Sequence, residues 1–310
     1  MAKLVTLFGG AGFLGRYVAQ ELLSAGARVR VAERDPKHAF FVKPLGGLGQ
    51  TQFVAADVTR ADSVQRAVEG ADAVINLVGV LKGDFDAVHV DGARNTAAAA
   101  AAAGARALVQ VSAIGADPGA PSAYARSKGE GEAAARAAFP GATILRPSIL
   151  FGAEDQFLNR FAALAQVLPV LPVIRPGVKF QPAWVGDVAR AVALSALEPG
   201  SHAGRTFELG GPEVLTMEAL MAWLMRTIGR DRPLLPLPDA VGRLLAGLGW
   251  LPGAPITRDQ WLMLQKDNVV SGGAEGFAAF GIAPAPLAAL APAWLVAYRR
   301  HGRFGTRSAA

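Results

Sequence analysis

The first half of the chain alternates short, continuously apolar runs with longer stretches in which apolar residues recur every three or four positions. Runs of the first kind are typical of buried strands, and stretches of the second kind are typical of helices. Strands that alternate with helices at this spacing build β-α-β units around a parallel sheet, which is apolar on both faces. Strands are predicted at residues 4–8, 28–32, 52–55, 73–78, 107–111 and 143–145, and helices at residues 14–25, 61–69, 91–103 and 127–138.

The second half has a different pattern. Prolines interrupt residues 165–185, which predicts loops and short edge strands there. A helix is predicted at 187–197, a short strand at 205–209, and a helix at 216–228 that Thr216 caps. We therefore expect an α/β fold: a Rossmann-type doubly wound parallel sheet with a smaller mixed C-terminal domain. The expected bounds are 1–160 for the first domain, to which 180–210 return, and 161–310 for the second.

Composition and charge narrow the range of functions. The chain has no cysteine, which excludes disulfides, thiolate metal sites and cysteine nucleophiles, and we expect no metal site. The net charge is +6, but the last twelve residues hold four arginines and no acid, so most of the excess is a basic tail and we expect no nucleic-acid partner. We identify no targeting leader before the first strand and no apolar stretch that spans a bilayer.

A glycine-rich turn joins the first predicted strand to the first predicted helix. A dinucleotide site needs a tight turn, bare backbone close to the pyrophosphate, and close packing of helix on strand, and glycine meets all three needs. The position between strand and helix is the context that gives such a motif its meaning. The turn predicts NAD(P) binding by Gly9, Gly10, Ala11, Gly12, Phe13, Leu14 and Gly15.

The end of the second strand bears on the choice of cofactor. An acid at this position binds the ribose hydroxyls of NAD, whereas an arginine accepts the 2′-phosphate of NADP. Both types are present, as Glu33 and Arg34, so these residues alone leave both cofactors open.

The spacing Gly9-x-x-Gly12-x-x-Gly15 resembles the short-chain dehydrogenase/reductase superfamily, in its extended or atypical branch. The resemblance implies catalytic roles for Ser112, Tyr124 and Lys128: the serine positions the substrate oxygen, the tyrosine transfers a proton, and the lysine lowers the tyrosine pKa and holds the nicotinamide ribose. It also implies cofactor contacts after later strands, at Asp57, Val58, Leu77, Val78, Gly79, Pro147, Ser148 and Ile149. Arg146 and Pro147 match an Arg-Pro turn that lies against the nicotinamide in that superfamily, and Asn95 is expected to be a structural bridge.

Several longer segments are similar to the nucleotide-binding accessory subunit of respiratory complex I and its bacterial relatives. They include residues 8–18, 47–50, 74–79, 151–159 and 181–188, and the run Phe151-Gly-x-Glu-Asp-x-Phe-Leu-Asn159 lies outside the generic cofactor motifs. This resemblance implies a subunit that holds NADPH without turnover, near the junction with the membrane arm. It also assigns the cofactor-binding arginine to Arg34, which favours NADP(H). Ser112, Tyr124 and Lys128 are then vestigial and only retain the cofactor.

Three functions remain open from the sequence. One is a structural NADP(H)-binding subunit or assembly factor of complex I, in the cytoplasm and peripherally attached to the bacterial inner membrane. The second is an active NADP-dependent reductase or epimerase acting on a small carbonyl or quinone-related substrate. The third is a regulatory binder without turnover. An apolar stripe within 239–264, with the basic tail, belongs either to the core of the small domain or to a surface that contacts a membrane subunit or lipid.

Overall fold

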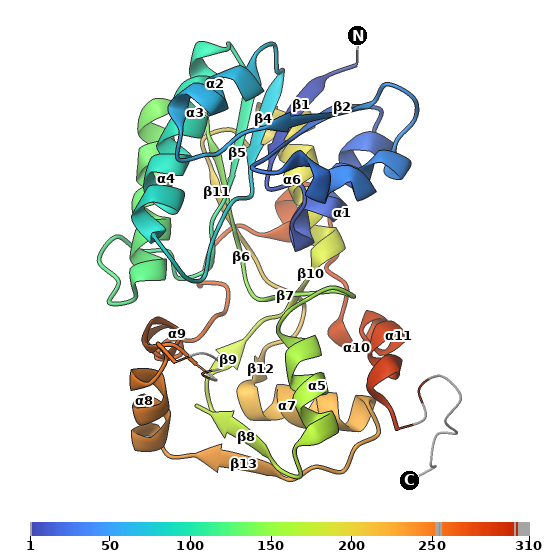
Figure 1. The fold of residues 1–310 in the computed structure, drawn as a ribbon, viewed down its shortest axis with the longest axis vertical. Helices are drawn as coiled ribbons and strands as arrows, with labels where there is room; N and C mark the ends of the chain where they lie inside the picture. The colour runs from blue at the N-terminus through green and yellow to red at the C-terminus, as the bar shows by residue number, and fades with distance from the viewer. Residues whose placement is uncertain (1, 252–253, 255, 301, 303–310) are drawn as a thin grey trace. The chain divides into compact units, whose positions relative to one another are not determined.

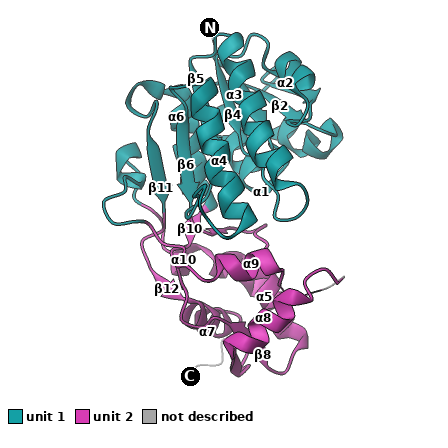
Figure 2. Cartoon of the chain, turned by 90° about the vertical axis from the view of Figure 1, so that its left-hand side faces the viewer, with its two compact units in different colours: residues 1–147, 185–209, 271–283 teal, residues 148–184, 210–270, 284–310 magenta. Residues whose placement is uncertain are grey.

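The computed structural model describes residues 2–251, 254, 256–300 and 302, and the chain folds into two compact units (Figures 1 and 2). The first unit comprises residues 1–147, 185–209 and 271–283, and the second comprises 148–184, 210–270 and 284–310. The first therefore ends at residue 147 rather than 160, and residues 271–283 return to it as well as 185–209. The boundary falls there because Phe151 and Leu158 pack into the hydrophobic core of the second unit.

The first unit is built on a seven-stranded sheet with the order β11-β6-β5-β4-β1-β2-β3, in which every pair is parallel. This is the doubly wound arrangement expected from the sequence, and its strand order reverses beside β1. The strands are β1 (Leu4–Phe8), β2 (Arg28–Glu33), β3 (Thr51–Ala55), β4 (Ala73–Asn76), β5 (Ala107–Val111), β6 (Thr143–Pro147) and β11 (Thr206–Leu209).

Helices cover both faces of this sheet (Figure 1). α1 (Phe13–Ser24) packs with α6 (Val185–Leu197), and α3 (Gly92–Ala102) packs with both α2 (Ala61–Val68) and α4 (Ala123–Ala138). The alanine-rich sequence of α3 has a packing role, because Ala93, Ala97 and Ala100 are buried in a core with Leu108 and Ile144 of the sheet. Small side chains let this helix approach the strands closely. A ten-residue 3₁₀ segment, η1 (Pro36–Leu45), follows β2.

Two predicted helix boundaries were wrong in this unit. α4 begins at Ala123 rather than Ser127, because the Ser122 hydroxyl accepts a hydrogen bond from the Ala125 N–H and caps the helix. A π-helical turn, η2 (Asp86–Asp91), runs directly into α3, so the helical region starts earlier than residue 91.

The second unit is smaller and mixed. Three short strand pairs form: β7 (Leu150–Phe151) with β10 (Ala183–Trp184), β9 (Lys179–Phe180) with β12 (Leu215–Thr216), and β8 (Leu171–Ile174) with β13 (Leu234–Leu237). The predicted N-cap of α7 is confirmed, since the Thr216 hydroxyl accepts a hydrogen bond from the Ala219 N–H at 3.1 Å. α7 spans Met217–Thr227. The helices are α5 (Leu158–Val167), α7 (Met217–Thr227), α8 (Asp239–Gly247), α9 (Arg258–Met263), α10 (Leu287–Leu290) and α11 (Pro292–Leu295).

Candidate cofactor site

The glycine turn packs so tightly that side chains are excluded at three positions. Gly9 has φ of 82°, and a Cβ at Gly10 would lie 2.7 Å from the Val31 side chain. A Cβ at Gly15 would lie 2.2 Å from the carbonyl oxygen of Gly9 and 2.6 Å from the Cα of Gly10, so the first turn of α1 rests on the backbone of the loop. A Cβ at Gly12, the exposed N-cap of α1, would meet only the Gly9 carbonyl. The turn therefore presents bare backbone at a helix N-terminus, which is the geometry that binds a pyrophosphate.

Glu33 at the end of β2 is tied to this turn. Its carboxylate accepts a hydrogen bond from the backbone N–H of Ala11 at 2.7 Å. Burial raises the pKa of this carboxyl group, while the Ala11 bond and the nearby Arg34 act in the opposite direction. Arg34 itself is exposed. The two residues expected to discriminate between NAD and NADP therefore have different surroundings. Glu33 hydrogen bonds to the glycine turn, whereas Arg34 lies at the surface.

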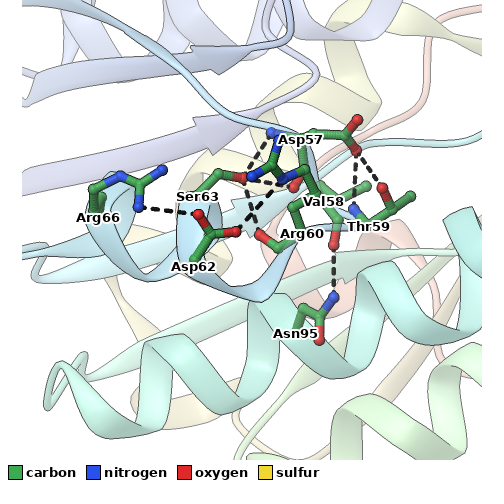
Figure 3. Close-up of polar contacts among 8 residues, drawn as sticks. All are labelled: Asp57, Val58, Thr59, Arg60, Asp62, Ser63, Arg66 and Asn95. Atoms are coloured by element: carbon green, nitrogen blue, oxygen red, sulfur yellow. Dashed lines mark hydrogen bonds and ion pairs between the residues drawn. The ribbon is translucent and has the colours of Figure 1, made fainter.

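A second polar network orders the segment after β3 (Figure 3). The Asp57 carboxylate accepts from the backbone N–H of Thr59 at 3.0 Å and from its hydroxyl at 2.9 Å. The Ser63 hydroxyl donates to the Asp57 carbonyl, and Asn95 of α3 donates to the Val58 carbonyl, both at 2.9 Å. Asn95 is therefore the structural bridge expected from the sequence, and it fixes the backbone of Val58, where a cofactor contact is predicted.

The loop after β4 is held by a buried amide pair. Asn76 donates through Nδ2 to Oε1 of Gln110 on β5 at 2.9 Å and accepts the Val78 N–H at 3.0 Å. The loop also lies against the glycine turn, because a Cβ at Gly9 would lie 3.3 Å from backbone atoms of Leu77 and Val78. The residues predicted from three successive strands are thus brought to one edge of the sheet.

Ser112, Tyr124 and Lys128 gather at the carboxyl end of β5. The Ser112 hydroxyl is buried, and no residue in the described part of the chain hydrogen bonds it. Lys128 is 6% exposed; its ammonium donates to the Val111 carbonyl at 3.3 Å and lies 5.9 Å from the centre of the Tyr124 ring. Burial lowers the pKa of Lys128 to about 8, against the opposing effect of Glu132 one turn along α4.

His89 belongs to the same cluster and was missed by sequence reasoning. It is 3% exposed, its Nδ1 lies 2.8 Å from the Ser127 hydroxyl, and its Nε2 lies 3.0 Å from the Val80 amide nitrogen. Its ring stands edge-on to Tyr124, at 5.4 Å between centroids. Burial, with a smaller contribution from Lys128, lowers its pKa to about 3. The only sequence signal is a histidine three residues before the glycine that opens α3.

The Arg146 side chain takes a different role from the one expected. Its guanidinium forms a bidentate ion pair with Glu132 of α4, at 2.8 and 2.7 Å, and a longer pair with Glu208 of β11 at 3.5 Å. The side chain therefore locks α4 to the sheet, and only the backbone at Pro147, the end of β6, stays a candidate for cofactor contact.

Ser148 and Ile149 belong to the second unit, where both bond to Asn268. The Ser148 hydroxyl donates to the Asn268 side-chain oxygen at 2.7 Å, and the Ile149 amide donates to the same oxygen at 3.0 Å. Asp155, in the most family-specific run, accepts from the amides of Phe157 and Leu158 at 2.9 and 2.6 Å and so caps α5. Asp155 of the run at 151–159 therefore has a structural role within the second unit, at the start of α5.

The residues of the first unit fit a dinucleotide. The glycine turn leaves room only for backbone beside the phosphates, the Ser112 hydroxyl has unused bonding capacity, and the buried Lys128 ammonium makes few bonds for a cation. A bound NAD(P) supplies a hydride at its nicotinamide ring, and these side chains can orient the ribose beside that ring. No group of three or more His, Cys, Asp or Glu side chains within the described ranges is placed to hold a metal ion.

The strand order, the glycine turn and the Ser-Tyr-Lys cluster define an NAD(P)-binding Rossmann protein of the short-chain dehydrogenase/reductase type. A protein family described as NAD(P)H-binding matches residues 9–160. The fold is similar to an NADPH-dependent quinone oxidoreductase from Escherichia coli complexed with NADPH, with a TM-score of 0.76, 22% identity and coverage of 94% of this chain and 99% of that one.

Relatives in sequence extend over more than the first unit. The mitochondrial "NADH dehydrogenase [ubiquinone] 1 alpha subcomplex subunit 9" of Arabidopsis thaliana is 34% identical over 98% of this chain and 80% of its own length. A "ceramide reductase" of Caulobacter vibrioides is 34% identical over 79% of this chain and 76% of its own length. The chain belongs to the family of these complex I subunits.

Proposed function

We propose that this protein is an NADP(H)-binding accessory or assembly subunit of respiratory complex I, and that it holds the cofactor without turning it over. The observation that carries the proposal is the extent of the match: the subunit of Arabidopsis thaliana aligns with 98% of the chain, through both units. A ligand that binds only the folded state stabilises it, by about 4 kcal/mol at a thousandfold excess over Kd. A tightly held NADP(H) therefore has a structural use without any reaction.

The loop between Ser112 and Tyr124 supports a site without turnover. Its polar side chains serve the loop itself: Asp117 accepts from the Gly119 N–H at 2.8 Å, and Ser122 caps α4. The remainder of the loop is rich in alanine, glycine and proline. Little in it is therefore left to recognise a polar substrate, and Tyr124 and Lys128 are assigned to holding the nicotinamide ribose.

The proposal includes a preference for NADP(H) over NAD(H). Glu33, the acid that would bind the adenosine ribose hydroxyls in an NAD site, already accepts the Ala11 N–H. The neighbouring Arg34 is exposed and adds a positive charge beside that ribose position. A guanidinium forms charge-assisted hydrogen bonds with a phosphate, which favours the 2′-phosphate of NADP.

The proposed partners are complex I subunits near the junction with the membrane arm, with the protein on the cytoplasmic side of a bacterial inner membrane. In the described part of the chain, no helix combines the length and apolar character needed to cross a membrane. The second unit carries an apolar surface on and after α8, with Leu244 67% and Trp250 77% exposed. We propose this surface, which we call the α8 face, as the contact with a membrane subunit or lipid. Its members are Val241, Leu244, Leu248, Trp250 and Leu251.

Part of the 239–264 region is core instead. Ala246, Ile256 and Trp261 are buried together, and α8 packs on α9 through them. Of the basic tail, Arg299 and Arg300 are described, while Arg303 and Arg307 lie outside the described residues. Arg299 donates through Nε to the Thr227 carbonyl at 3.1 Å, so it anchors to α7.

The proposal is tested by tagging the chain in its native host, solubilising membranes gently, and identifying the proteins that migrate with it on a native gel. Recovery near one-to-one with subunits of the quinone-reducing complex, together with tightly bound NADP(H), is the expected result. Recovery only with immature subcomplexes would identify an assembly factor. Recovery as a free protein in every condition would contradict the proposal.

The second candidate is an active NADP-dependent reductase of a small carbonyl or quinone-related substrate. Two observations favour it: the buried Ser112 hydroxyl is available to a substrate oxygen, and a relative named ceramide reductase matches at 34% identity. Oxidation of bound NADPH by such a carbonyl, lost in Tyr124→Phe and retained in the control Tyr17→Phe, would establish this function.

A further inference from the structure

The π-helical turn η2 places a histidine inside the first unit at a point where three segments meet. His89 contacts Val80 of the loop after β4 and Ser127 of α4, and it leads by η2 into α3. A π turn is rare and is frequently found at functional sites.

The hydrogen bonds of His89 have a single consistent direction. The Val80 amide can only donate, so Nε2 accepts its hydrogen and Nδ1 carries the ring proton. Nδ1 then donates to the Ser127 hydroxyl at 2.8 Å, and that hydroxyl donates to the Tyr124 carbonyl at 3.0 Å. The chain of hydrogen bonds therefore runs from the loop after β4, at Val80, to the backbone carbonyl of Tyr124 on α4.

The position of the imidazole is fixed by the side chains and backbone that pack around it. Its ring stacks on Phe85 at 5.5 Å between centroids and meets the edge of Tyr124. α4 passes directly over the π turn, because a Cβ on Gly131 would lie 2.2 Å from the His89 carbonyl oxygen. A Cβ on Gly79 would lie 3.1 Å from Nζ of Lys128 and 3.6 Å from Nε2 of His89, so the loop, the lysine and the histidine are mutual neighbours.

We infer that His89 is the positioning residue of the cofactor site, which ties the loop at residues 77–80 to Tyr124 and Lys128 of α4 so that both sides meet the nicotinamide ribose together. The inference rests on the proposed binding of NADP(H). His89 itself need not touch the cofactor, because it acts through Val80 and Ser127. We expect its main effect on the nicotinamide half, because the residues that it touches include Val80, Ser127 and Tyr124.

Imidazole suits this role because it offers an acceptor and a donor on opposite sides of a flat ring. Phenylalanine keeps the stacking but removes both bonds, whereas glutamine restores one polar atom near the Nε2 position. A charged imidazole would set a second N–H against the Val80 N–H, with the Lys128 ammonium nearby. The depressed pKa keeps the ring neutral through the physiological range.

Binding of NADPH and of 2′,5′-ADP, which lacks the nicotinamide half, tests the inference when both are titrated by calorimetry. His89→Phe should weaken NADPH by about tenfold, as expected for losing two neutral hydrogen bonds, and leave 2′,5′-ADP unchanged. It should also shift the fluorescence of bound NADPH, and His89→Gln should restore part of the affinity. If His89→Phe does not fold, Ser127→Ala interrupts the same chain of bonds and carries the same expectation.

The matched control is His202, a second buried histidine of the first unit. It precedes β11, and so lies at the amino-terminal ends of the parallel strands, away from the candidate site at their carboxyl ends. Its Nδ1 hydrogen bonds to the Glu198 carbonyl. His202→Phe should leave the ratio of the two affinities unchanged. Equal weakening of both ligands by His89→Phe, or no change in either, would overturn the inference. A wild-type protein that binds neither ligand would overturn the proposed function, and this inference with it.

Discussion

Glu33 and Ala11 are joined by a 2.7 Å hydrogen bond from the Ala11 amide to the Glu33 carboxylate. The bond connects the end of β2 to the glycine turn, so the acid helps shape the loop that faces the pyrophosphate. Arg34, the next residue, is exposed. Glu33 and Arg34 are therefore expected to have separate roles, and the first prediction concerns Arg34.

Arg34→Ala should weaken NADPH binding and leave NADH binding nearly unchanged. Loss of a charge-assisted hydrogen bond to the 2′-phosphate costs about 1.5–3 kcal/mol, or roughly tenfold to a hundredfold in Kd. Calorimetric titration with both cofactors measures the ratio. Arg28→Ala is the matched control, since Arg28 is exposed at the other end of the same strand. An equal loss for both cofactors would contradict the assigned role of Arg34.

Lys128→Met should stabilise the cofactor-free protein while it abolishes tight cofactor binding. The pKa of Lys128 is lowered from 10.5 to about 8 by burial, so at neutral pH the fold carries an unfavourable buried charge. The gap between these values corresponds to roughly 3 kcal/mol of unfolding free energy. Urea unfolding of the empty proteins measures the difference.

The difference in unfolding free energy between the wild type and Lys128→Met should depend on pH. The folded-state pKa lies below the unfolded value, so the penalty is fully present below about pH 8 and disappears as pH rises to 10.5. The stability advantage of Lys128→Met should therefore shrink over that window. Lys266→Met, at an exposed lysine of the second unit, should show no such trend. A pH-independent difference would rule out the buried charge as its cause.

Gly15→Ala should disrupt the site through packing alone. The added Cβ would lie 2.2 Å from the Gly9 carbonyl oxygen, so the turn or α1 must move. Overpacking of this kind costs about 1–3 kcal/mol, and cofactor binding should fall further because the moved atoms face the pyrophosphate. Thermal unfolding with and without NADPH reports both effects. Gly200→Ala, where a Cβ meets nothing within 4 Å, is the control.

Leu244→Glu and Trp250→Glu should release the protein from its complex or from the membrane without loss of cofactor. Both side chains are exposed on the α8 face, so stability should change by no more than about 0.5 kcal/mol. Sedimentation with native membranes and co-migration on a native gel measure association. Val167→Glu alters an equally exposed apolar residue (81%) elsewhere in the second unit, and it should leave association intact. Equal release by all three variants would remove the α8 face from consideration.

The sequence predicted the parts of this structure that depend on neighbours along the chain. The glycine turn, the parallel strands and the Thr216 cap follow from local periodicity and steric demands, and the structure confirms them. Tyr124 and Lys128 were also recognisable, because a spacing of four places both on one helix face.

Features that depend on distant partners were not predictable. His89 carries no motif, and its place follows only from a π turn that packs against α4. Arg146 was expected beside the nicotinamide, but two acids on other elements bind its side chain. The return of residues 271–283 to the first unit rests on contacts such as the Ser271 amide with Glu208, which no local pattern encodes.

Burial of the Lys128 ammonium lowers the stability of the folded chain, and a bound cofactor that accepts hydrogen bonds from this ammonium would offset part of that cost. Proteases in the cell act on the fraction of molecules that open, and that fraction falls as ligand binds. Newly made copies would therefore survive in proportion to the supply of NADP(H). Under the proposed function, the number of subunits that reach assembly would then follow the amount of this cofactor in the cell.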